Sequence, residues 1–330
     1  MNMIDLKDIQ KARNRLVGHI ETTVLRSSIR LSEFCGVSVG LKLEHHQKTG
    51  SFKLRGATNA MMVLSVDERR RGIVTASTGN HGRALAFAAR RLGARAIVCV
   101  SQLVPENKVL EIRSLGADVR IVGSSQDDAQ REAERLVDEN GLVMLPPFDH
   151  PDIVAGQGTI GIEIVESMPD VATVLVPLSG GGLAAGVAAA VKGLQPATRV
   201  IGVSMDRGAA MKVSLDRARP VQVEEFSSLA DSLGGGIGLD NKITFRMCEA
   251  LLDDVILVTE QEIAAGIRHA YAYEREIVEG AGAVGIAALL ARKVTSKGPI
   301  TIILSGRNID LGLHKNVLNG WNSLQGEGNP

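Results

Sequence analysis

The sequence has 330 residues, of which 45% are hydrophobic and 22% charged, with 37 basic and 37 acidic side chains. A domain usually takes about 100 to 200 residues, so this length predicts two lobes with a cleft between them. The composition is that of a globular protein and excludes a disordered or fibrous one. The basic residues are scattered, which excludes nucleic acid as a partner, because phosphate binding needs a concentrated positive surface.

Cysteine usage and hydrophobic patterning indicate the compartment. Cys35, Cys99 and Cys248 are isolated, which argues against disulfides and against a zinc site built on cysteines. The N-terminal segment is charged and lacks the apolar core of a signal peptide. Residues 171–191 are uncharged and long enough to span a membrane, but Pro177 and a glycine run favour a strand, a turn and a helix. We therefore expect a cytoplasmic protein with no membrane partner.

Short apolar runs alternate with helical segments, a pattern typical of parallel strands joined by crossover helices. The predicted fold class is α/β, with each lobe an open, mostly parallel sheet flanked by helices. Asp5 is expected to cap the first helix, and Thr259 with Glu262 forms a capping box for a helix that continues through Ala272. The predicted strands are residues 41–44, 73–76, 96–100, 119–122, 173–178, 200–204, 255–259 and 300–304.

Lys53, in the segment SFKLRGA, falls in the first turn of a predicted helix. A cation is unfavourable there, because the helix dipole is positive at that end. Burial and the dipole both lower the pKa of a lysine, which favours the free amine needed for a Schiff base. Taken alone, such a lysine is more often an exposed one at a helix start.

The segment STGNHG, residues 77–82, follows a strand and precedes a helix. Backbone N–H groups at such a helix start bind a carboxylate or a phosphate. Ordinary capping of the helix by Ser77, Thr78 or Asn80 explains the same residues.

The segment SGGGL, residues 179–183, links another strand to an alanine-rich helix. Consecutive glycines let the backbone approach an anion closely, which predicts a phosphate site. The same residues match a dinucleotide fingerprint, Gly180-x-Gly182-x-x-Ala185 with Asp206 downstream, so on this loop alone a nicotinamide-dependent dehydrogenase is the better interpretation.

Taken together and in this order, SFKLRGA, STGNHG, SGGGL and the SGRN segment at residues 305–308 resemble the fold-type II enzymes of pyridoxal 5′-phosphate (PLP). That family includes threonine and serine dehydratases, serine racemase and hydroxyaspartate ammonia-lyases, and the resemblance overrides the dinucleotide interpretation. It implies a tryptophan synthase β-like fold, PLP as the cofactor and a homodimer. The implied large PLP-binding domain is residues 1–66 and 147–330, and the small mobile domain is residues 67–146.

The resemblance also implies the roles of individual residues. Lys53 is the Schiff-base lysine and general base, and Thr78 is the second catalytic residue, a hydroxyl opposite Lys53 where serine racemase has serine. The implied cofactor-binding residues are Phe52, Lys53, Asn80, Ser179, Gly180, Gly181, Gly182, Leu183, Glu279 and Ser305. The implied substrate-binding residues are Ser77, Thr78, Gly79, His81 and Ser232.

No metal is expected, since Ser204 stands where the family's cation site has a glutamate, although Asp206 nearby offers one carboxylate. The implied activity is β-elimination of water, then ammonia, from a small β-hydroxy amino acid such as threonine, serine or 3-hydroxyaspartate. The segments SFKLRGATNAM, STGNHGRALAFAARRLG and ADSLGGGIGLDN are similar to dehydratases encoded with hydroxyectoine-utilisation genes, which points to a ring-opened hydroxyectoine derivative. A PLP racemase, a β-replacement synthase and a catalytically silent sensor stay open as alternatives.

Overall fold

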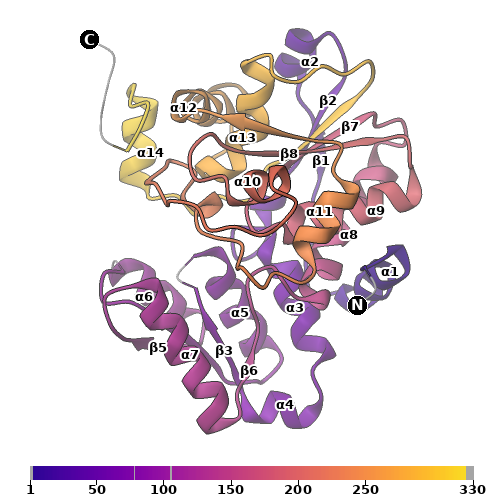
Figure 1. Cartoon of the computed structure of the whole chain (residues 1–330). Helices are drawn as coiled ribbons and strands as arrows, with labels where there is room; N and C mark the ends of the chain where they lie inside the picture. Colours follow the sequence, from indigo (N-terminus) through magenta and orange to yellow (C-terminus); the bar gives the residue numbers. More distant parts are fainter. Residues whose placement is uncertain (1–2, 78, 105, 325–330) are drawn as a thin grey trace.

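The computed structural model describes residues 3–77, 79–104 and 106–324 and contains two sheets, of six and four strands (Figure 1). The six-stranded sheet has the order β1-β2-β10-β7-β8-β9, and the four-stranded sheet the order β5-β4-β3-β6. The strands are β1 (Leu25–Ser27), β2 (Val39–Lys42), β3 (Ile73–Ala76), β4 (Ala96–Val100), β5 (Asp118–Ile121), β6 (Val143–Met144), β7 (Thr173–Pro177), β8 (Arg199–Met205), β9 (Asp254–Val258) and β10 (Ile300–Ile303).

Helices connect these strands and cover both faces of the larger sheet (Figure 1). The α-helices are α1 (Leu6–Leu16), α2 (Ile29–Cys35), α3 (Lys53–Val63), α4 (Val66–Arg71), α5 (Asn80–Arg91), α6 (Glu106–Ser114), α7 (Gln126–Asn140), α8 (Pro151–Ser167), α9 (Gly182–Leu194), α10 (Ala210–Asp216), α11 (Thr244–Leu251), α12 (Glu260–His269), α13 (Gly280–Leu290) and α14 (Leu311–Leu318). The short helices are the 3₁₀ turns η1 (Glu44–His46) and η2 (Asp231–Leu233) and the π-turn η3 (Ala270–Glu274).

All the strand pairs are parallel except β1 with β2, which is antiparallel. The α/β class and the mostly parallel sheets predicted from the sequence are therefore confirmed. Each strand predicted above is present, with bounds that differ by one or two residues. Parallel pairing places the carboxyl ends of β10, β7 and β8 at one edge of the large sheet, where open α/β sheets bind ligands.

The helix α3 packs against the smaller sheet's core as well as against α8 of the larger unit. Leu54, Ala57 and Met61 of α3 are fully buried in one cluster with Ile73 of β3 and Leu85 of α5. In Figure 1 this helix lies between the two sheets. The strands of the small sheet all fall between residues 73 and 144. The division into a large domain and a mobile domain of residues 67–146 stays a prediction.

The predicted helix starts are confirmed, and one predicted helix end is wrong. Asp5 caps α1, and Thr259 with Glu262 forms the predicted capping box of α12. However, α12 ends at His269 and not at Ala272. The chain widens there into the π-turn η3, and Arg275 turns it away with a left-handed backbone, φ 62°. This turn directs the next residues toward the edge of the large sheet.

A buried ionic cluster lies beneath α3. The Arg55 guanidinium donates to both oxygens of Glu44 and to both oxygens of Glu163, at 2.6 to 2.8 Å. The Lys42 ammonium donates to Glu163 Oε2 at 2.5 Å and to the carbonyl of Thr23 at 2.6 Å. Since Lys42, Glu44 and Arg55 are wholly buried, these partners are what makes the charges tolerable inside the protein.

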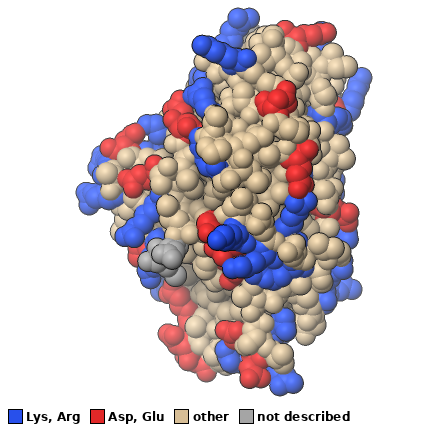
Figure 2. Space-filling view, turned by 90° about the vertical axis from the view of Figure 1, so that its right-hand side faces the viewer, with Lys and Arg blue, Asp and Glu red and all other residues tan. Residues whose placement is uncertain are grey.

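The surface carries both signs of charge, and Figure 2 shows them interspersed over the face that it presents. No helix within residues 3–77, 79–104 and 106–324 is long and apolar enough to cross a membrane. Cys35, Cys99 and Cys248 are all free thiols.

Candidate active site

A cavity of about 970 Å³ is lined by residues of both sheet units and opens at the strand ends described above. It brings together nearly every residue that the resemblance singled out. Thr78 lies outside the described residues. The other predicted residues all line the cavity: Phe52, Lys53, Ser77, Gly79, Asn80, His81, Ser179, Gly180, Gly181, Gly182, Leu183, Ser232, Glu279 and Ser305.

Lys53 is the first residue of α3, as the sequence predicted. Its ammonium donates to the Pro147 carbonyl at 2.7 Å and lies 5.3 Å from the centre of the Phe52 ring. Burial lowers the pKa of Lys53 to about 8, against a smaller opposing effect of Glu279. Near neutral pH the unprotonated fraction of this amine is therefore much larger than that of an ordinary lysine. The unprotonated amine can form a covalent bond to a carbonyl group.

The glycine loop between β7 and α9 is shaped by close packing. Gly181 has a left-handed backbone, φ 87°, and no side chain caps α9. A Cβ on Gly180 would lie 2.3 Å from the Phe148 ring, so no larger residue fits without a shift. The N–H groups that begin α9 are left for a ligand, and the helix dipole favours an anion there. This cradle fits the phosphate of PLP.

The loop at the start of α5 has the same character. Gly79 is the N-cap of the helix, and among the described residues no side-chain hydrogen bond caps it. His81 Nε2 donates to the Leu145 carbonyl at 2.9 Å. Burial, and then the charge of Lys53, lower the pKa of His81 to about 3, so the imidazole is neutral. The backbone N–H groups at such a helix start can bind a second anion, such as a carboxylate.

Asn80 and Glu279 meet across the cavity. The Asn80 amide donates to Glu279 Oε1 at 2.7 Å, and the backbone N–H of Asn308 donates to Glu279 Oε2 at 3.0 Å. Burial raises the pKa of Glu279 to about 7, and the nearby Asp231 raises it further, while hydrogen bonds including one from Ser232 oppose the shift. The network joins α5 of one unit to the N-terminus of α13 in the other.

Ser305 lies two residues after the end of β10 and is 2% exposed. Its carbonyl accepts the Phe52 N–H at 3.0 Å, which ties the cavity floor to the residue before Lys53. Its hydroxyl makes no hydrogen bond to any residue that the structure describes. An unpartnered, neutral hydroxyl in the cavity wall fits the ring nitrogen of PLP, because a buried polar group requires a partner.

Several lining residues were missed by the sequence analysis. Pro147 and Phe148 follow β6. Asp127 comes from the start of α7, and residues 225–228 come from an irregular segment with no recognisable motif. The sequence analysis also gave no role to Asn308 of the SGRN segment, which does not line this cavity but donates to Glu279 in its wall.

The sequence predicted no metal at Ser204 and Asp206. Ser204 is buried within β8, and Asp206 follows that strand. Within the described part of the chain, neither belongs to a group of three or more His, Cys, Asp or Glu side chains with ligand atoms close together.

Comparison with known proteins identifies the family. Residues 16–306 match the model of the pyridoxal-phosphate dependent enzyme family. The chain is 66% identical to a putative threonine dehydratase of Sinorhizobium fredii, over 97% of each chain. It is 40% identical to an L-threonine ammonia-lyase of Thermotoga maritima, over 96% of this chain and 79% of that one.

Solved structures agree with the predicted fold-type II architecture. The processed form of threonine deaminase isoform 2 from Solanum lycopersicum matches with a TM-score of 0.88 and 36% identity, covering 95% of this chain and 86% of that one. Maize serine racemase matches with a TM-score of 0.90 and 30% identity, covering 96% and 98%. The family model covers residues 16–306, and the relatives match nearly the whole chain, so the chain belongs to the family of pyridoxal-phosphate dependent enzymes.

Proposed function

We propose that the protein is an ammonia-lyase that removes water, and then ammonia, from a small β-hydroxy amino acid. The observation that carries this proposal is the Lys53 amine, whose pKa is about 8 and which lies in one cavity with two helix N-termini that no side chain caps. The similarity to the threonine ammonia-lyase and the putative threonine dehydratase supports β-elimination as the reaction.

When bound, PLP supplies an electron sink for the charge that develops at the substrate Cα. The residues of the chain position the reactants and move the protons. Residues 180–182 bind the cofactor phosphate, and the first turn of α5 binds the substrate carboxylate, each through backbone N–H groups. Lys53 takes the α-proton as general base, a role suited to an amine with a pKa near the working pH.

The β-hydroxyl then leaves as water, taking up the proton that Lys53 received from Cα, and the enamine product loses ammonia by reaction with water. Ser305 is neutral and does not fix a proton on the cofactor nitrogen, so the charge at Cα is held less strongly. Prompt loss of a β-substituent is then favoured over return of the proton. We therefore expect elimination to exceed racemisation.

The lining of the cavity supports a substrate larger and more basic than threonine. Its lining includes a run of small residues, Ser232 and residues 234–236. Three further carboxylates line it, those of Asp127, Glu225 and Asp231. Acidic lining favours a side chain that carries an amino group and disfavours the second carboxylate of 3-hydroxyaspartate. A diaminobutyrate with a β-hydroxyl, the skeleton of ring-opened hydroxyectoine, meets both conditions, and we propose it as the preferred substrate.

The test compares kcat/KM for the ring-opened hydroxyectoine derivative, L-threonine, L-serine and threo-3-hydroxyaspartate, because this ratio reports differential binding of the transition state. We expect the first compound to be preferred and D-amino acids to be a minor product. A preference of about tenfold or more for threonine, about 1.4 kcal/mol, would leave a general threonine/serine dehydratase. D-amino acids in equal or larger amount than keto acids would contradict elimination as the main reaction.

The proposal includes three features implied by the family: a homodimer, a cytoplasmic location and movement of residues 67–146 relative to the rest. Light scattering of the holoenzyme checks the first. Hydrogen exchange with and without substrate checks the last.

A further inference from the structure

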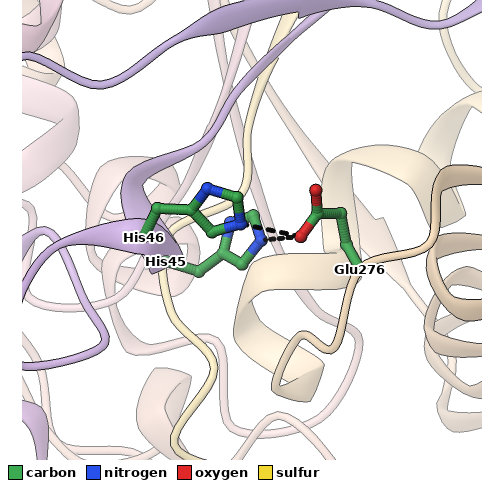
Figure 3. Close-up of side chains that lie close together, drawn as sticks. All are labelled: His45, His46 and Glu276. Atoms are coloured by element: carbon green, nitrogen blue, oxygen red, sulfur yellow. Dashed lines mark hydrogen bonds and ion pairs between the residues drawn. The ribbon is translucent and has the colours of Figure 1, made fainter.

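Two histidines and a glutamate converge outside the cofactor cavity (Figure 3). His45 Nε2 and His46 Nε2 lie 2.7 and 2.8 Å from the same oxygen, Glu276 Oε2. The histidines belong to η1, which follows β2, whereas Glu276 belongs to the segment that follows the π-turn η3. In Figure 3 both imidazole rings point at one carboxylate oxygen from the opposite segment.

We propose that His45, His46 and Glu276 bind one zinc-like divalent transition-metal ion. Two imidazoles and one carboxylate are a common set of three protein ligands for Zn²⁺, with the fourth position left to water. This metal site is distinct from the Ser204 position, where the sequence predicted no metal.

The distances fit an ion after a small adjustment. With metal–ligand bonds of about 2.0 to 2.2 Å in tetrahedral geometry, neighbouring ligand atoms lie roughly 3.3 Å apart. The present separations are 2.7 and 2.8 Å, and all the candidate ligand atoms lie within 4.8 Å of one another. The side chain of His46 is 44% exposed and free to adjust, while those of His45 and Glu276 are 1% and 9% exposed. Two N–H protons now occupy the space that an ion would take.

A neighbouring arginine orients the Glu276 carboxylate for metal binding. Arg26 donates to the other oxygen of Glu276 at 2.8 Å, which fixes the carboxylate and leaves Oε2 for the ion.

The buried Nδ1 atom of His45 has no hydrogen-bond partner among the residues described. A metal on Nε2 would place the remaining ring proton on Nδ1. Metal-bound histidines usually donate this other N–H to an acceptor.

The surroundings leave room for the fourth ligand. The three side chains line a second cavity of about 780 Å³, which is separate from the cofactor cavity. Arg275 and Asp310 also line it, so that both signs of charge surround the open position. Water or a small anion can therefore reach the ion from this side.

The position suggests a structural role for the ion. From His46 the chain runs directly into the Gly50–Lys53 turn, and from Glu276 it runs to Glu279 at the start of α13. An ion here would clamp together two segments that both lead into the cofactor cavity. Metal binding should therefore raise the thermal stability of the holoenzyme.

The experiment uses untagged holoenzyme, freed of excess cofactor and of metal by dialysis against a chelator and then buffer. Co²⁺ is titrated with visible spectroscopy and calorimetry, and Zn²⁺ is added to displace it. We expect one Co²⁺ per chain with the intense absorption of four-coordinate cobalt, and a rise in Tm with Zn²⁺.

His46→Gln is the decisive variant, because the partly exposed side chain can be changed without disturbing the core. Loss of a residue that only contacts a metal ligand lowers metal affinity by roughly 10- to 100-fold. His46→Gln removes a ligand itself and should therefore weaken Co²⁺ binding by more than that. It should also abolish the Zn²⁺-dependent rise in Tm. His19→Gln, a matched histidine outside the cluster, should bind as the unaltered protein does. Equal Co²⁺ affinity in the unaltered protein and His46→Gln, or no binding by either, would overturn the proposal.

Discussion

Lys53 and Arg55 stand in the same first turn of α3 but face opposite environments. Arg55 lies in the buried ionic cluster, where Glu44 and Glu163 raise the already high pKa of its guanidinium despite burial. Lys53 faces the cofactor cavity, where its partner is the neutral Pro147 carbonyl and burial lowers its pKa to about 8. Residues two positions apart on a helix point in different directions, so a single turn serves both environments.

The contrast shows how the helix start combines stability with reactivity. Arginine does not lose its proton in a protein, and its planar group binds two carboxylates at once, so it is suited to the ionic cluster. Lysine changes its pKa readily when enclosed, so it is suited to the cavity. The fold thus holds one permanent cation in place by direct hydrogen bonds to buried carboxylates, whereas the neighbouring amine donates to a neutral carbonyl. Three predictions test this division.

The largest expected effect follows from Lys53→Ala. Loss of the general base alone lowers turnover by about 100- to 10,000-fold, and loss of the covalent attachment adds to it. Lys53→Arg should lose as much activity, because it keeps the charge but cannot release its proton. Keto-acid formation measures turnover, and urea unfolding should show that the fold is intact. Near-normal activity in either variant would refute the role of Lys53.

Arg55→Met should instead act on stability. The change leaves Glu44 and Glu163 buried without their main partner, which typically costs about 3 to 5 kcal/mol. Arg13→Met is the matched control, since Arg13 pairs with Glu166 on the surface, where such pairs contribute roughly 0 to 1 kcal/mol. Urea unfolding of the two apoproteins measures the difference. Equal losses of unfolding free energy in the two variants would mean that the buried ionic cluster contributes no more to stability than a surface ion pair does.

The sequence predicted the local features of the fold well. Apolar runs of strand length, glycines and capping residues act over a few neighbours, and they placed eight of the ten described strands, the start of α3 at Lys53 and the loops before α5 and α9. The short strands β1 and β6 were not predicted. The family resemblance then grouped these segments in one site, and thirteen of the positions other than Lys53 that it named line the cavity.

Contacts between distant segments were not predictable from local patterns. Glu163 is 108 residues from Arg55, and Glu279 is 199 residues from Asn80, so no short motif links either pair. The interaction of His45 and His46 with Glu276 also joins segments that are far apart in the sequence. It depends on how the π-turn η3 directs the chain. Such pairs become visible only after the strand order of the sheet is known.

The smallest predicted effect is a pH dependence, measured as the rate at which apoenzyme captures PLP. Capture needs the unprotonated Lys53 amine, whose pKa is about 8 and not the usual 10.5. Below pH 8 the unprotonated fraction, and with it the rate, should rise about tenfold per pH unit, and above pH 8 it should level off. Glu279→Gln sharpens the test, because the Glu279 charge raises the pKa of Lys53 and its removal should move the midpoint to lower pH. Stopped-flow absorbance in the bound cofactor's band gives the rate at each pH, and Arg13→Met provides a variant whose midpoint should not move. A rate that continues to climb to pH 10 would show that Lys53 behaves as an ordinary exposed lysine, and the contrast with Arg55 would then have no electrostatic basis.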